Sequence, residues 1–152
     1  MLMRIMGLDY GDKNIGVALC DELHVIAYGV EVIKKKSLKT FAPETERIKE
    51  LVINYQVDKI VLGFPKNLDG TVGFQAKIIL EFKKCLYNSL RNIYGIAIEI
   101  LLWDERMSSR FVEKTFSRNG INTRKQKSIK DKIAAVFILQ GYLDYVNHKE
   151  RG

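Results

Sequence analysis

Hydrophobic positions along the chain fall into short runs that turn-forming residues separate. Residues 4–8, 15–20 and 25–33 are mostly apolar, and Asp-Tyr-Gly-Asp-Lys-Asn at 9–14 lies between the first two runs. Runs of this length that are rich in valine and isoleucine predict β-strands. Because short connections join the three runs, we expect an antiparallel meander.

The hydrophobic period then changes. Apolar residues recur at helical spacing after Pro43, which predicts a helix that begins near this proline. The tight apolar run at 59–63 is typical of a buried parallel strand, and 97–103 predicts another strand. Further helices are expected at 75–91, 108–117 and 128–146, and loops at 64–74 and 119–127.

This order predicts an α/β fold with one mixed five-stranded sheet and helices on both faces. The length of 152 residues is typical of one domain, and no linker or internal repeat interrupts the chain. We therefore interpret residues 1–152 as a single domain.

Composition excludes several classes of protein. The hydrophobic content of 47% argues against disorder, and two cysteines cannot form a disulfide scaffold. The longest apolar run, 133–139, is far shorter than a membrane span, and residues 1–7 do not form a signal peptide. We expect a cytoplasmic protein without membrane contact.

Charge is distributed unevenly along the chain. The net charge is +7, and the last 48 residues hold 11 basic and 5 acidic residues. The excess of positive charge therefore lies almost entirely in the last third. Such asymmetry is typical of proteins with a polyanionic partner such as nucleic acid, but a merely solvated lysine-rich surface explains the charge alone equally well.

Candidate chemistry lies with acidic residues at the ends of predicted elements. Asp9 ends the first strand, Asp104 and Glu105 follow the last strand, and Asp131 begins the last helix. Open α/β sheets bind ligands at the carboxyl ends of their strands. Carboxylates gathered there repel one another unless a divalent cation neutralises them, and oxygen ligands suit Mg²⁺ or Mn²⁺. Such ions can activate water for phosphodiester hydrolysis.

Each acid also has a structural interpretation. Asp9 could stabilise a turn, and Glu105 could complement a helix dipole. Ser128 and Asp131 resemble a capping box, which by itself is the stronger interpretation of Asp131. Against it, Ala134 and Ala135 lie beside Asp131 on the helix and would let the helix approach the sheet closely.

Four motifs occur together in one order: GLDYGDKNIGVA at 7–18, VLGFPKNLDGT at 61–71, WDERMSS at 103–109 and DKIAAVFILQGYLD at 131–144. They resemble the YqgF (RuvX) family of candidate Holliday junction resolvases and candidate nucleases of the small-subunit ribosomal RNA precursor. The resemblance spans essentially the whole chain. Asn14 departs from the arginine usual in the family, as Phe64 and Met107 depart from leucine.

The resemblance implies a ribonuclease H-like fold and a metal-dependent nuclease site at Asp9, Glu105 and Asp131. Asp104 is the alternative to Glu105, because strand alternation lets only one of the two face the site. Other residues could hold the phosphates of a nucleic acid: Lys13, Lys66, Asn67, Arg106, Arg124, Lys125 and Lys127. Ordinary surface exposure explains Lys13, Lys66 and Arg106 equally well.

The sequence thus favours a nuclease that processes the pre-16S ribosomal RNA, with a Holliday junction resolvase as the main alternative. A resolvase cuts two strands symmetrically and should be a homodimer, whereas an RNA-processing enzyme can be a monomer. Two rival interpretations are a non-catalytic nucleic-acid-binding module and a phosphate-binding domain of the actin and sugar-kinase type. The second rival normally needs two such domains, and this chain has room for one.

Overall fold

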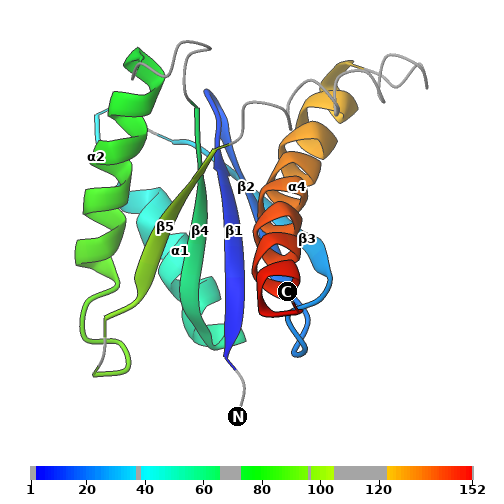
Figure 1. The fold of residues 1–152 in the computed structure, drawn as a ribbon. Coiled ribbons are helices and arrows are strands. Elements are labelled where there is room, and N and C mark those ends of the chain that lie inside the picture. The colour runs from blue at the N-terminus through cyan, green and yellow to red at the C-terminus, as the bar shows by residue number, and fades with distance from the viewer. Residues whose placement is uncertain (1–2, 37–38, 66–72, 96, 105–122, 152) are drawn as a thin grey trace.

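The computed structural model describes residues 3–36, 39–65, 73–95, 97–104 and 123–151, with the backbone alone at 123–128 and 150–151. Within these residues, eight elements follow one another (Figure 1). They are β1 (Arg4–Tyr10), β2 (Asn14–Cys20), β3 (Ala27–Lys34), α1 (Ala42–Tyr55), β4 (Val57–Phe64), α2 (Phe74–Ser89), β5 (Glu99–Asp104) and α4 (Thr123–Arg151).

The strands form one mixed sheet in the order β3-β2-β1-β4-β5. The β1–β2 and β2–β3 pairs are antiparallel, and the β1–β4 and β4–β5 pairs are parallel. The predicted meander and the predicted mixed five-stranded sheet are therefore confirmed. Because β1, β4 and β5 are parallel, their carboxyl ends lie at one edge of the sheet, at the top of Figure 1.

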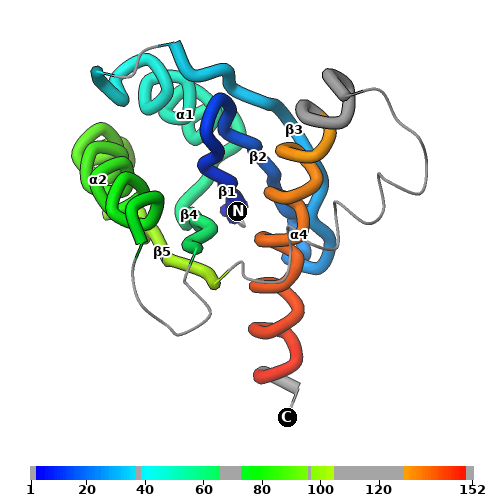
Figure 2. The backbone as a smooth tube through the Cα atoms, turned by 90° about the horizontal axis from the view of Figure 1, so that it is seen from above, coloured from blue at the N-terminus to red at the C-terminus, as the bar shows by residue number. Residues whose placement is uncertain are grey.

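Alternation along β1 divides its side chains between two cores. Met6 and Leu8 belong to the larger core, which includes buried residues of α1 and α2. Ile5 belongs to the smaller core, which α4 covers. Seen from above, α1 and α2 lie on one side of the sheet and α4 on the other, as predicted (Figure 2). This alternation assigns each residue of β1 to one of the two faces of the sheet.

Small residues let α4 approach the sheet closely. A Cβ atom at Gly7 would lie 2.7 Å from Leu139 Cβ and 3.0 Å from the Ala135 carbonyl oxygen. A Cβ at Gly16 would collide with the Asp131 carbonyl oxygen. The predicted role of Ala135 in this close approach is confirmed, since Ala135 is fully buried against β2. The matching glycines on the strands were not predicted.

The start of α4 corrects the sequence interpretation. A loop was predicted at 119–127 and a helix from residue 128, whereas α4 already includes Thr123. The polar residues at 124–127 are arginine, lysine and glutamine, which are good helix formers. Asp131 therefore lies about two turns inside the helix, and the capping-box interpretation of Asp131 is wrong.

Two smaller points complete the comparison. Phe64 and Phe74, which were assigned to a loop, belong to β4 and α2. The helix expected at 108–117 lies outside the described residues. Within the part of the chain that the structure describes, every helix is too short or too polar to cross a lipid bilayer.

Candidate active site

Asp9 lies near the carboxyl end of β1, on the face of the sheet that α4 covers. Gly7, two residues earlier, faces α4, so alternation directs Asp9 to the same side. Asp9 also pairs with Gly16 of β2 across the antiparallel ladder. Paired residues project from the same face, and Gly16 meets α4. Asp9 is half-buried at this junction of sheet and helix.

Asp131 reaches the same junction from α4. Asn14 Nδ2 donates a hydrogen bond of 2.9 Å to Asp131 Oδ2. A Cβ atom on Gly11 would lie 3.8 Å from Asp131 Oδ1. Both carboxylate oxygens therefore lie against the β1–β2 turn. The structure thus brings Asp9 and Asp131 to one place, although they come from opposite ends of the chain.

Lys35 holds the β1–β2 turn from the other side. Lys35 Nζ donates hydrogen bonds to the carbonyl oxygens of Gly11 (2.9 Å) and Asp12 (3.0 Å), and Lys35 N donates to the Lys13 carbonyl oxygen (2.9 Å). Its ammonium also lies 4.0 Å from the centroid of the Tyr10 ring. Three consecutive carbonyl groups are thereby directed toward one lysine, which fixes the turn that carries Asn14.

Burial shifts the ionisation of groups around this turn. Burial lowers the pKa of Lys35, and the nearby carboxylates of Asp12 and Glu44 partly offset this decrease. Burial, together with the charge of Glu44, raises the pKa of Tyr10 to about 12. Tyr10 is therefore neutral at physiological pH. Nothing in the sequence singles out Lys35, because it follows β3 and no motif connects it with the turn.

Register decides the face of Asp104. Trp103 pairs with Gly63, and its Nε1 lies 3.3 Å from the position of a Cβ atom at Gly141 of α4. Trp103 therefore faces α4, and alternation places Asp104 on the opposite face of the sheet from Asp9. Asp104 is exposed. This geometry disfavours Asp104 as a partner of Asp9 and Asp131.

The remaining predicted site residues have different outcomes. Lys13 lies exposed in the β1–β2 turn. Glu105, Lys66, Asn67 and Arg106 lie outside the described residues. The backbone of Arg124, Lys125 and Lys127 belongs to the first turns of α4, and their side chains are not described. Among the residues that are described, no three metal-ligating side chains gather.

Solved structures show which class of fold this is. RuvC of T. thermophilus in complex with a Holliday junction substrate has a TM-score of 0.56 at 10% identity, covering 97% of this chain and 96% of that one. The fowlpox virus Holliday junction resolvase has a TM-score of 0.54 at 19% identity, covering 94% and 99%. At such low identity the likeness concerns the fold alone. The chain has the ribonuclease H-like fold of the RuvC-type resolvases.

Sequence comparison defines the family more narrowly. The model of the family RuvX, described as Holliday junction resolvase, matches residues 3–145, and the chain belongs to this family. A relative in Clostridium tetani is 44% identical over 97% of this chain and 100% of its own length, and one in Bacillus subtilis is 43% identical over 95% and 100%. Both relatives are named as candidate pre-16S rRNA nucleases. The family resemblance seen in the motifs is thus confirmed, and the chain is a nuclease, a hydrolase of phosphodiester bonds in nucleic acid.

Proposed function

We propose that this nuclease processes the precursor of the small-subunit (pre-16S) ribosomal RNA in the cytoplasm, through a divalent-metal site at Asp9, Glu105 and Asp131. The observation that carries the proposal is the convergence of Asp9 and Asp131 at the α4 face of the sheet. Relatives that are 40–44% identical and named for pre-16S rRNA supply the substrate. Residues 1–152 act in this proposal as one ribonuclease H-like domain.

The donor set fits Mg²⁺ or Mn²⁺. Asp9 and Asp131 offer carboxylate oxygens, which both ions prefer to nitrogen or sulfur ligands. Glu105 is the third candidate, because Asp104 lies on the other face of the sheet. A bound ion would neutralise the gathered carboxylates and lower the pKa of a water molecule that attacks the phosphodiester.

The protein's own residues have separate roles in this proposal. The Asn14 amide orients the Asp131 carboxylate by its hydrogen bond to Oδ2. Lys35 fixes the turn that holds Asn14 in place. Lys13, Lys66, Asn67 and Arg106 hold phosphates of the bound strand near the cut. Arg124, Lys125 and Lys127 add positive charge at the start of α4, so binding should weaken steeply as salt rises.

The test is cleavage of a labelled pre-16S rRNA fragment in Mn²⁺ and in EDTA, with a four-way DNA junction as the parallel substrate. Asp9→Asn should abolish metal-dependent cutting and keep or improve RNA binding, since it removes a negative charge. Asp12→Asn is the matched control, because Asp12 is an exposed acid in the adjoining turn and should cut within a few-fold of wild type. An Asp9→Asn variant that cuts as fast as wild type would refute the site.

A Holliday junction resolvase is the second candidate function, favoured by the description of the matching family model. It requires symmetric paired cuts in the junction and, by symmetry, a homodimer. The RNA-processing function allows a monomer. Paired cuts in the DNA junction alone, with the RNA left intact, would favour the resolvase. Binding of either substrate without cleavage would favour a non-catalytic module.

A further inference from the structure

Aromatic side chains of β5 and α4 form a continuous cluster on the α4 face of the sheet. The Trp103 ring lies 5.7 Å from the Tyr142 ring and 5.8 Å from the Tyr145 ring, measured between centroids, and both pairs meet edge to face. Tyr142 is buried, Trp103 is half-buried, and Tyr145 is 55% exposed. The Tyr142 ring is therefore packed inside the protein, whereas the Tyr145 ring is open to solvent.

Two lysines flank these rings. Lys149 Nζ lies 5.9 Å from the Tyr145 centroid, and Lys59 Nζ lies 5.8 Å from the Tyr142 centroid and 3.2 Å from its hydroxyl oxygen. Trp103, Tyr142, Tyr145, Lys59 and Lys149 together are called the aromatic–lysine strip below. Glu99 Oε2 lies 3.9 Å from Lys59 Nζ and offsets part of its charge. Lys149, which is exposed, is the principal cation of the strip.

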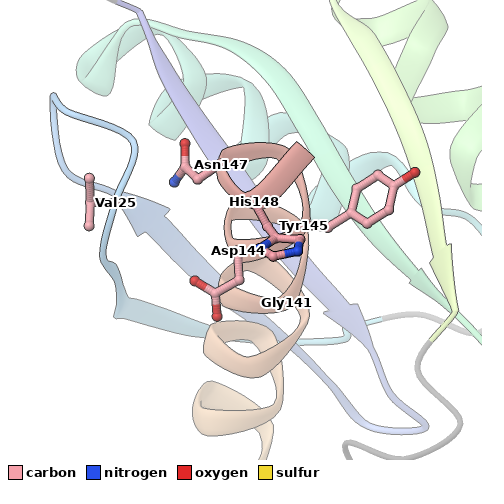
Figure 3. Close-up of a pocket in the computed structure, with 6 residues that line it drawn as sticks. All are labelled: Val25, Gly141, Asp144, Tyr145, Asn147 and His148. Atoms are coloured by element: carbon pink, nitrogen blue, oxygen red, sulfur yellow. The ribbon is translucent and has the colours of Figure 1, made fainter. Parts of the chain in front are cut away.

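The Trp103 end of the strip adjoins the candidate active site. Leu8 of β1 pairs with Leu62 of β4, and Leu62 pairs with Leu102 of β5. Asp9 and Trp103 each come one residue after this row of paired residues, and both face α4. Trp103 also directly precedes the Asp104–Glu105 pair. Figure 3 shows Tyr145 extending from α4 toward the β5 side of the sheet, away from Val25. Tyr145 lies 14 positions after Asp131 on α4, about 21 Å farther along the helix axis. A strand bound at Asp9 and Asp131 would therefore meet the strip first at Trp103 and would reach Tyr145 a few nucleotides farther on.

The chemistry of the strip selects one kind of ligand. Unpaired bases stack on aromatic side chains, and lysines next to the rings attract the phosphates that join the bases. A paired helix keeps its bases inside the duplex and offers nothing to an exposed tyrosine ring. We propose that the aromatic–lysine strip binds an unpaired segment of the RNA substrate a few nucleotides from the bond that is cut. This inference rests on the proposed function for the choice of RNA.

A binding experiment without metal separates the strip from catalysis. Trp103 is the only tryptophan of the chain, so its fluorescence reports on a base that binds beside it. In EDTA, an unpaired oligouridylate should quench this fluorescence, and a blunt RNA duplex should not. Tyr145→Leu keeps an apolar side chain but removes the ring, and it should weaken oligouridylate binding about tenfold by fluorescence anisotropy of the labelled RNA. Tyr145→Phe should restore binding.

The matched control is Tyr87→Leu, which removes a tyrosine that is 44% exposed on α2, on the other side of the sheet. It should leave the affinity unchanged. Equal affinities of Tyr145→Leu and wild type for oligouridylate would overturn the strip, even if the precursor is cut. Conversely, the wild-type enzyme could fail to cut the precursor while Tyr145→Leu still loses affinity for oligouridylate. That result would refute the proposed function but support the binding role of the strip. If Tyr145→Leu weakens binding of oligothymidylate as much as binding of oligouridylate, the ligand of the strip is an unpaired strand of either DNA or RNA.

Discussion

The side-chain amide of Asn14 donates a 2.9 Å hydrogen bond to Asp131 Oδ2, across 117 positions of the chain. This contact joins the β1–β2 turn to α4 at the point where the candidate metal ligands meet. Asn14 stands where the motif of the family usually has arginine, so this chain presents a neutral donor to Asp131. The hydrogen bond makes Asn14 a positioning residue for Asp131, and the residue can be tested as one.

Asn14→Ala should lower the rate of RNA cleavage about tenfold, because Asp131 loses the group that orients it. The loss of one hydrogen bond to a charged group should also cost about 1–2 kcal/mol of stability. Asn14→Arg, which introduces the family's usual residue, should retain cleavage within a few-fold. The measurement is the metal-dependent cleavage rate at saturating RNA, together with urea unfolding. An Asn14→Ala enzyme with the wild-type rate would show that Asp131 does not need this orientation.

Gly16→Ala should destabilise the protein by about 3 kcal/mol, because the new methyl group collides with the backbone of α4 at Asp131. The helix would have to move away from the sheet, which also separates Asp131 from Asp9. Gly29→Ala is the control: its methyl group would meet the Lys132 side chain and not backbone, and a change of that side chain's rotamer can relieve the contact, so the loss should be smaller than for Gly16→Ala. Urea denaturation of both variants measures the difference. Similar losses for the two would contradict the role given to the close contact of Gly16.

Lys35→Met should destabilise the protein by about 1–2 kcal/mol and reduce cleavage, because the Gly11 and Asp12 carbonyl groups lose their shared donor. The substitution keeps an unbranched side chain that is one atom shorter, and it also removes the ammonium from the Tyr10 ring. Lys34→Met, at the exposed neighbouring position, should change neither quantity. Chemical denaturation and cleavage assays on the two variants test this. A stable, fully active Lys35→Met enzyme would mean that the turn holds its shape without Lys35.

Acid should weaken the connection between β3 and α1. The hydrogen bonds from Arg47 (2.8 and 2.6 Å) hold the pKa of Glu31 below its ordinary value of 4.5, against the opposing effect of partial burial. A lowered pKa in the folded state gives stability that is present above the unfolded pKa and is lost as pH falls through the folded pKa. Glu31→Gln should therefore flatten the fall in the free energy of unfolding below pH 4.5. Glu50→Gln should change it less, because the side chain of Glu50 is 60% exposed and solvent screens its pair with Arg47. Equal slopes for Glu31→Gln and wild type would contradict the assignment.

Much of the fold follows from local sequence signals. Apolar runs separated by turn residues located all five strands, and helical spacing located α1 and α2 to within a few residues. These signals are local, because a strand or helix shows its buried face in the period of its own residues. The start of α4 was mispredicted for the same reason, since the polar residues at 124–127 show no apolar face.

The site was predictable only in part. Asp9 stands out as an acid in an apolar setting, whereas Asp131 is indicated by the small residues Ala134 and Ala135 beside it. The motifs contain both acids together with Glu105. The face on which Asp104 lies could be assigned only from the register of β5 against β4. Alternation along a strand says that neighbours lie on opposite faces, but one residue must first be placed in a core before the others can be assigned. Lys35 could not have been singled out, because its partners are backbone carbonyl groups, which leave no trace in sequence.

The sequence by itself located the strands, indicated the family and predicted the acids of the candidate site, because periodicity and motifs are properties of neighbouring residues. Only the tertiary structure decided how these parts meet. It paired Asn14 with Asp131, placed glycines where α4 contacts the sheet, and set Trp103, Tyr145 and Lys149 side by side. These contacts join residues far apart in the chain, and they exist only once the packing of α4 on the sheet has fixed their distances.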